Sequence, residues 1–134
     1  MLIPSIVAAV LAATQTVTQI PAKDVSAAFA KGAPLVKGDT YKVDASRREA
    51  AGEVEVHETD TDVFYVLDGT ATFVTGGTLE GGRTIAPGEI RGKAIKGGDV
   101  RTLSKGDVIV IPKGTPHWFR DVPGPITYFV VKAK

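Results

Sequence analysis

Short apolar runs separated by glycine and proline constrain the fold of this chain more than any other feature. The run Val63–Leu67 ends at an Asp-Gly pair, and Val108–Ile111 is stopped by Pro112. The 134 residues include 15 glycines and 8 prolines, which predicts tight turns and short strands in place of long helices. From residue 35 onward the pattern predicts about nine or ten strands, which indicates an all-β sandwich or barrel.

One short helix is predicted before the strands, at Asp24–Lys31. Asp24 is a good N-cap, alanines fill the interior, and Gly32 stands at the C-terminal stop. The buried stripe of this helix would consist of Val25, Ala28 and Phe29.

A strand predicted at residues 53–59 has an unusual alternation. Val54 and Val56 fall on one face, so Glu55, His57 and Thr59 share the other. If His57 points into a cavity, Glu55 points there too.

Two further stretches are predicted to lie outside regular strands. Residues 60–62 (Asp-Thr-Asp) are typical of a turn. Residues 76–98 are rich in glycine and hold apolar residues only singly, which predicts a long excursion with one or two weak strands over a cavity mouth.

Charge and cysteine content exclude several classes of function. Sixteen Lys and Arg nearly balance fifteen Asp and Glu, so no charge excess favours nucleic acid or an anionic membrane surface as a partner. The absence of cysteine excludes disulfides, zinc–thiolate sites and thiol nucleophiles. A chain that is 43% hydrophobic and 23% charged is typical of a globular domain, and its length suffices to bury a core.

The first 22 residues carry no charged side chain and contain an almost wholly apolar run, Ile3–Ala13. This run suits the core of a signal peptide and is shorter than the roughly 20 residues that span a bilayer. The alternative is an N-terminal arm packed on the domain or on a second subunit. We divide the chain into a leader at 1–22 and a single domain at 23–134. We expect an exported protein if residues 1–14 are a signal peptide, and a cytoplasmic one otherwise.

The second half of the chain resembles the second sequence motif of the cupin superfamily. That motif reads Gly, five residues, Pro, one residue, Gly, two residues, His, three residues, Asn. Gly106, Pro112, Gly114 and His117 meet the spacing, and Asp121 stands where Asn is usual.

The first cupin motif is matched less completely. His57 takes the place of its first histidine, and Gly52 precedes His57 with four residues between. Thr59 stands where the second histidine is expected. Asp62 stands one residue early in the place of the glutamate, with six residues between it and Gly69.

The resemblance implies an all-β double-stranded β-helix, or jelly-roll, barrel in which the two motifs face each other. Cupins commonly hold one divalent metal ion through the motif histidines and the glutamate, and many form dimers. Their activities include oxygenases, isomerases and lyases, and others only bind ligands or serve as structural proteins. The fold alone therefore names no reaction.

His57 and His117 are the predicted ligands of one divalent metal ion, because neutral imidazole binds Fe, Mn, Ni, Cu or Zn. The alternative is a pair of hydrogen-bonded histidines in a metal-free pocket. Asp62 is the carboxylate that the resemblance carries over, and its alternative role is that of a turn residue. Glu55 is an independent candidate, either as the third ligand or as a catalytic general acid or base.

Other side chains are candidates for substrate contacts. The hydroxyl of Thr59 would hold a metal-bound water, or else Thr59 packs as an ordinary strand residue. Most aromatic side chains must fill the core of a small barrel, and one or two are predicted to line a ligand pocket. The candidates are Tyr41, Phe64, Trp118 and Phe119.

These observations predict a metal-binding cupin that binds or transforms a small polar molecule inside its barrel, without nucleic acid or a membrane span. If it is an enzyme, a metal-dependent oxygenase, isomerase or lyase is expected. The alternative is a metal-free, non-catalytic protein that binds a small ligand or forms a structural homodimer through outward strand faces such as Val54 and Val56. The sequence leaves enzyme and binding protein open.

Overall fold

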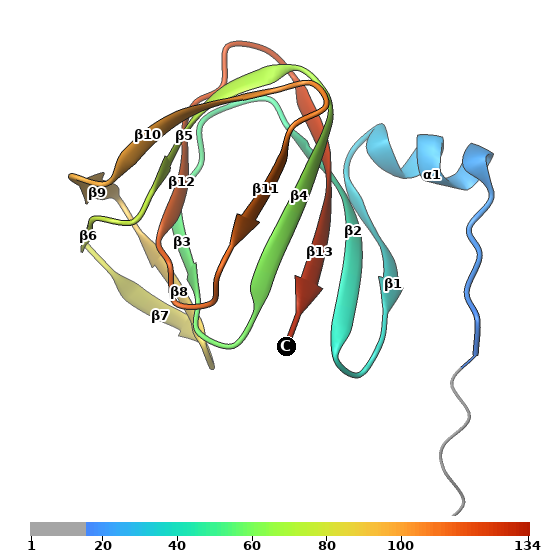
Figure 1. The fold of residues 1–134 in the computed structure, drawn as a ribbon, viewed down its shortest axis with the longest axis horizontal. Helices are drawn as coiled ribbons and strands as arrows, with labels where there is room; N and C mark the ends of the chain where they lie inside the picture. The colour runs from blue at the N-terminus through green and yellow to red at the C-terminus, as the bar shows by residue number, and fades with distance from the viewer. Residues whose placement is uncertain (1–15) are drawn as a thin grey trace, which may run out of the picture.

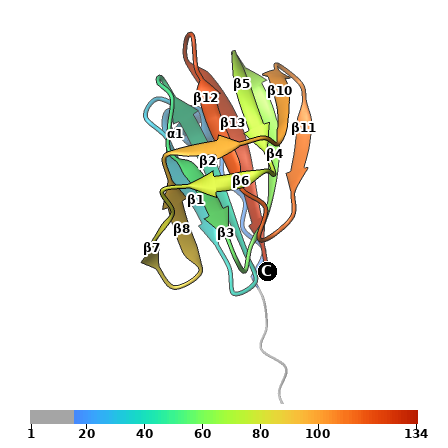
Figure 2. The same cartoon turned by 90° about the vertical axis from the view of Figure 1, so that its left-hand side faces the viewer.

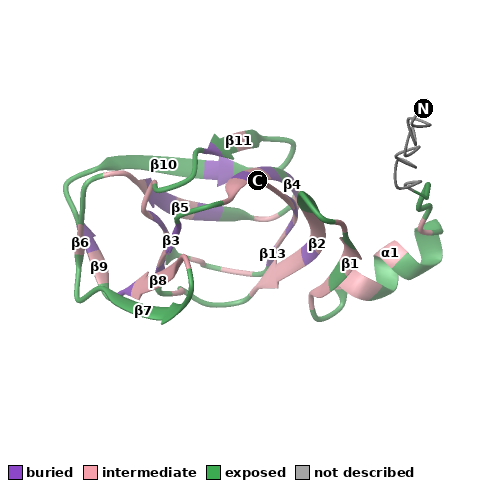
Figure 3. Cartoon of the chain, turned by 90° about the horizontal axis from the view of Figure 1, so that it is seen from below, coloured by how far each residue is buried: buried purple, intermediate pink, exposed green. Residues whose placement is uncertain are grey.

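The computed structural model describes residues 16–134 as one short helix followed by antiparallel sheets (Figure 1). One sheet has the strand order β1-β2-β13-β4-β11, and the second has the order β10-β5-β12-β3-β8-β7. A separate two-stranded sheet pairs β6 with β9. The two larger sheets face each other and enclose the interior of a barrel, as the view from below shows (Figure 3). The predicted all-β barrel is confirmed.

The helix α1 spans Ala22–Phe29. The strands are β1 (Ala33–Lys37), β2 (Tyr41–Arg48), β3 (Val54–His57), β4 (Thr61–Asp68), β5 (Thr70–Thr75), β6 (Thr78–Glu80), β7 (Arg83–Ala86), β8 (Glu89–Gly92), β9 (Ala94–Lys96), β10 (Asp99–Ser104), β11 (Val108–Ile111), β12 (His117–Asp121) and β13 (Ile126–Ala133).

Helix α1 begins two residues earlier than the sequence predicts. Pro21 takes the N-cap position without a side-chain hydrogen bond, and Asp24 lies in the first turn, where a negative charge suits the helix dipole. Gly32 ends the segment as predicted, with a positive φ of 83° and its N–H donating to the Ala28 carbonyl at 2.9 Å. The helix lies outside the barrel beside β1 and β2 (Figure 1), with Phe29 edge-on against Phe129 at 4.9 Å between ring centroids.

Strand alternation places the main core between the two large sheets. The buried members of this core come from six strands, β4, β5, β10, β11, β12 and β13. They are Phe64, Val66, Ala71, Phe73, Leu103, Ile111, Phe119, Ile126, Tyr128 and Val130. Strands β4 and β13 are neighbours, and their inward side chains alternate with outward ones such as Tyr65.

A second apolar cluster covers the outer face of the sheet that holds β3. Val54, Val74 and Ile95 are buried there, with Leu79 and Trp118 packed against them. Figure 2 shows β6 lying across this face.

Val54 and Val56 are only 0% and 7% exposed, so the prediction of an intermolecular interface at these two valines is wrong. The β6–β9 ribbon covers Val54 on the outer face of the sheet. Exposed apolar side chains lie instead on β4 and β11, at Tyr65, Val108 and Val110. The homodimer itself stays a prediction.

Two loop predictions need correction. Residues 60–62 are not a turn, since Thr61 and Asp62 begin β4 and Asp62 pairs in register with Ile111 and Lys132. Pairing on both sides of the strand outweighs the local turn preference of Asp-Thr-Asp. Residues 76–98 hold four short strands in place of one or two, and β8 pairs directly with β3.

The apolar run Ile3–Ala13 falls within residues 1–15, outside the described residues. Export and the division of the chain at residue 22 therefore stay predictions. In the part of the chain that is described, no helix has the length and apolarity needed to cross a membrane.

Candidate functional site

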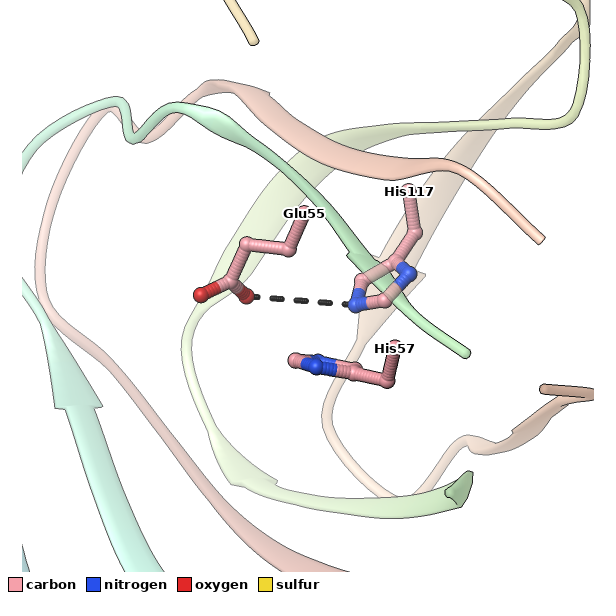
Figure 4. A group of neighbouring side chains, drawn as sticks. All are labelled: Glu55, His57 and His117. Atoms are coloured by element: carbon pink, nitrogen blue, oxygen red, sulfur yellow. Dashed lines mark ion pairs between the residues drawn. The ribbon is translucent and has the colours of Figure 1, made fainter. Parts of the chain in front are cut away.

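Two buried histidines converge on one point inside the barrel (Figure 4). His57 ends β3 and His117 begins β12, and these strands are neighbours in one sheet. The two residues are 4% and 2% exposed, and their ring centroids lie 5.0 Å apart. The two histidines predicted to share a site are therefore brought together.

The Nδ1 atom of each imidazole lies within hydrogen-bond distance of an acceptor oxygen. His57 Nδ1 lies 2.6 Å from Glu89 Oε2, and His117 Nδ1 lies 3.0 Å from the Thr115 carbonyl oxygen. In the neutral rings both Nδ1 atoms donate to these acceptors, so both Nε2 lone pairs face the interior. His117 Nε2 is buried and has no hydrogen-bond partner within residues 16–134.

Asp62 lies beside both imidazoles, on the inward face of β4. It is 2% exposed, and its Oδ2 is 3.4 Å from His57 Nε2 and 3.7 Å from His117 Nε2. The ammonium of Lys132, from the inward face of β13, donates to Asp62 Oδ1 at 2.9 Å and to Oδ2 at 3.1 Å. A third donation reaches His57 Nε2 at 3.2 Å.

Glu55 faces the same interior, as the alternation of its strand predicts. Its Oε2 is 3.8 Å from His117 Nε2, the contact drawn in Figure 4. Two guanidinium groups flank the carboxylate: Arg91 at 3.4 Å and Arg48 at 3.7 Å. Glu55 therefore joins the histidine cluster to a pair of half-buried arginines.

Burial and charge shift the pKa values of the two histidines in opposite directions. Burial lowers the pKa of His117 below its ordinary value, which favours the neutral imidazole. For His57, burial also favours the neutral form, but hydrogen bonds with Asp62 and Glu89 outweigh it and raise the pKa of His57. Burial opposes ionisation of Asp62, but contacts with His57 and Lys132 outweigh it and lower the pKa of Asp62.

The donor atoms of this cluster fit a metal ion. One ligand atom each from Glu55, His57 and His117 lies within 4.8 Å of the others. Imidazole nitrogen and carboxylate oxygen together suit first-row divalent ions. The unpartnered Nε2 of His117 and the Glu89 contact behind His57 match the way proteins orient ligating histidines.

Several residues predicted to contact substrate lie elsewhere. Thr59 is exposed in the turn after β3, because the Glu58 N–H donates to the Gly88 carbonyl and the strand ends at His57. Trp118 faces the outer cluster and donates from Nε1 to the Gly52 carbonyl at 2.9 Å. Tyr41 is 41% exposed on the outward face of β2. These three predictions are wrong for the described site.

Of the predicted aromatic residues, Phe64 lies beside the cluster and Phe119 packs against Phe64. The ring of Phe64 is 6.4 Å from that of His117, edge-on. Phe119 stacks parallel to Phe64 at 6.1 Å. Both are buried in the core, so they form the apolar floor under the histidines.

Sequence reasoning missed Glu89 and Lys132. The inward alternation of Ile126, Tyr128 and Val130 continues to Lys132, and this period-two pattern was a usable signal. Glu89 follows Gly88 in the glycine-rich stretch, where no periodicity marks an inward side chain. Only the pairing of His57 with Glu89 across β3 and β8 places it.

The fold and this cluster define a small barrel protein with an interior histidine–carboxylate site. A family model described as Cupin matches residues 10–132, and the chain therefore belongs to the cupin family. No curated protein matches the chain.

Solved structures share the fold at low sequence identity. BH2720 from Bacillus halodurans is 18% identical with a TM-score of 0.59, over 83% of this chain and 75% of that one. NMB1881 from Neisseria meningitidis is 13% identical with a TM-score of 0.58, over 87% and 100% of the two chains. The DMSP lyase DddQ from Ruegeria pomeroyi is 18% identical with a TM-score of 0.55, over 77% of this chain and 46% of that one. At these identities the likeness shows the fold alone.

Proposed function

We propose that this cupin binds one divalent metal ion through His57 Nε2, His117 Nε2 and a carboxylate, and uses it to bind or transform a small polar molecule. Among the described residues, Glu55 and Asp62 supply the carboxylates that lie near the inward Nε2 atoms of the histidines. When bound, such an ion supplies Lewis acidity to an oxygen atom of the substrate.

The observation that carries this proposal is the orientation of the two imidazoles. Each Nδ1 is engaged by a fixed acceptor, and each Nε2 faces the same point inside the barrel. A merely structural pair of buried histidines would satisfy both nitrogens of each ring, because an unsatisfied buried acceptor costs about 1–3 kcal/mol. His117 Nε2 stays without such a partner among the described residues.

A cavity next to β1 and β2 supports a polar ligand, although its lining includes neither histidine and not Asp62. It measures about 400 Å³ and opens along the inner face of β2. Lys42, Asp44, Ser46 and Arg48 contribute to its lining, and Arg48 also contacts Glu55. This composition favours a small molecule with several hydrogen-bonding groups. If the protein is an enzyme, the proposed reactions are those of an oxygenase, an isomerase or a lyase. One solved neighbour is named as a lyase.

Calorimetric titration of chelator-treated protein with Mn²⁺ and with Ni²⁺ tests the proposal. We expect one ion per chain for the wild type and loss of this binding in His117→Ala, because the substitution removes a ligand nitrogen. Thr59→Ala is the matched control, since Thr59 is exposed in the turn after β3 and its replacement should leave the affinity unchanged. Equal binding by the wild type and His117→Ala would sink the proposal.

Glu89 is expected to position His57 for the metal. The substitution Glu89→Gln removes the negative charge that fixes the Nδ1–H tautomer of His57. Loss of a carboxylate that orients a ligating histidine weakens metal binding roughly 10–100-fold. The same titration measures the effect. Glu53→Gln serves as control, because exposed Glu53 is paired with Arg83 and not with the site. If the metal affinity of Glu89→Gln equals that of the wild type, Glu89 does not position His57.

A second candidate function is a metal-free ligand-binding cupin. The observation that favours it is the ammonium of Lys132 beside Asp62 and His57, which already places a positive charge in the cluster. In that case the wild type would show no stoichiometric metal binding under the titration described above, while remaining folded.

A further inference from the structure

The ammonium of Lys132 makes three contacts that match its three N–H donors. They reach Asp62 Oδ1 at 2.9 Å, Asp62 Oδ2 at 3.1 Å and His57 Nε2 at 3.2 Å. All three acceptor atoms belong to Asp62 and His57, two residues that the sequence predicts as metal ligands. An ammonium and a divalent ion need the same lone pairs, so His57 Nε2 cannot serve both at once.

We infer that Lys132 is a tethered cation that competes with the metal ion for His57 and Asp62, and so sets the affinity of the site. The inference rests on the proposed metal function. A cation supplied by the chain itself balances the nearly fully buried Asp62 carboxylate, whose side chain is 3% exposed, whenever the site holds no ion. Metal binding then requires that Lys132 leaves.

The structure provides a place for the displaced ammonium. The Lys132 side chain is 21% exposed, and the same residue lines a surface cavity of about 200 Å³. Asp39 and Asp60 line this cavity together with Lys37, Lys42 and Lys134. Rotation of the long, flexible side chain would move its charge from buried Asp62 into this surface cavity, where water and the two carboxylates stabilise it, without movement of β13.

Lys132→Met tests the competition, with Lys42→Met as the matched control. Lys42 is the register partner of Lys132 on β2, faces the same barrel interior, and pairs with Asp44 and not with the histidines. Both variants remove one positive charge near the cavity that Lys42 and Lys132 share, so a general charge effect appears in both, and only the larger effect in Lys132→Met reports competition for the site. Apparent affinity scales with the fraction of molecules whose site is free. If Lys132 occupies the site in more than about nine molecules in ten, its removal tightens Mn²⁺ binding about tenfold or more.

The outcomes separate the inference from the proposed function. Tighter Mn²⁺ binding in Lys132→Met than in both the wild type and Lys42→Met supports the inference. Equal affinities in all three proteins overturn it and leave the metal function standing. Absence of binding in all three overturns both. If only Lys132→Met binds Mn²⁺, Lys132 competes with the ion, and the wild type is the metal-free ligand-binding protein.

Lysine acetylation of the unmodified protein, followed by mass spectrometry, covers the case in which Lys132→Met fails to fold. With the chelator present, Lys132 should be protected by its contacts with Asp62 and His57. Saturating Mn²⁺ should raise its labelling, while that of Lys42 stays constant. Unchanged or reduced labelling of Lys132 at saturating Mn²⁺ would overturn the inference.

Discussion

The substitution Asp62→Asn is expected to lower the free energy of unfolding of the metal-free protein by roughly 3 kcal/mol. The substitution keeps the shape of the side chain and removes its charge, so the ammonium of Lys132 loses the partner that it contacts at 2.9 Å. Loss of one partner from a buried ion pair costs about 3–5 kcal/mol. We place the effect at the lower end because the Lys132 side chain is 21% exposed and reaches water.

Urea unfolding in the presence of a chelator measures this effect. Asp68→Asn is the matched control, because Asp68 is exposed at the far end of the same strand. Its replacement should change the unfolding free energy by no more than about 0.5 kcal/mol. A cost below about 1 kcal/mol for Asp62→Asn would show that the ion pair adds little to stability.

The same pair predicts how stability depends on acid. The pKa of Asp62 is lower in the folded protein than in the unfolded chain, so the stabilisation is fully present above the unfolded pKa and is lost as the pH falls through the folded one. Below about pH 4 the wild type should therefore lose stability faster than Asp62→Asn. The difference in unfolding free energy between the wild type and Asp62→Asn should become smaller as the pH falls. A difference that stays constant with pH would contradict the assignment of this acid sensitivity to Asp62.

Truncation of Phe73 in Phe73→Ala is expected to cost about 3–5 kcal/mol of the free energy of unfolding. Phe73 is 0% exposed, and its ring lies 4.8 Å from Phe119 and 5.8 Å from Phe64. Its removal leaves a cavity in the aromatic floor under the histidines, since the His117 ring is 6.1 Å away. Weaker metal binding should accompany the loss of stability.

Thermal and urea unfolding of Phe73→Ala, Phe73→Leu and Val100→Ala check this prediction. Phe73→Leu keeps more of the buried volume and should cost less than the alanine variant. Val100 lies on the neighbouring strand β10 and is 60% exposed, so its truncation should cost about 0.5 kcal/mol or less. Similar values for Phe73→Ala and Val100→Ala would contradict the packing argument.

The barrel was predictable because its signals are local and repeated. The apolar runs and the turn residues that end them placed a strand at Val108–Ile111, the range that β11 occupies. The second motif likewise placed His117 where a turn delivers it to the start of β12.

The site was predictable only in part because it is assembled by contacts between distant strands. Asp62 carries a local turn signal, and pairing with β11 and β13 turns the same residue into a buried strand position. Glu89 lies in a stretch without periodicity and reaches His57 only through the pairing of β8 with β3. Lys132 was marked by the alternation of its strand, but its partners lie 70 and 75 residues away.

Those separations bear on how the protein folds. Lys132 on β13 contacts Asp62 on β4 and His57 on β3, so its contacts form only when β13 has paired with β4 and the two sheets face each other. Long-range contacts of this kind are slow to form, because chain closure must precede them. The contacts of Lys132 with Asp62 and His57 therefore exist in the native barrel and in no partly folded chain that lacks β13. They stabilise the finished fold selectively over such partly folded chains.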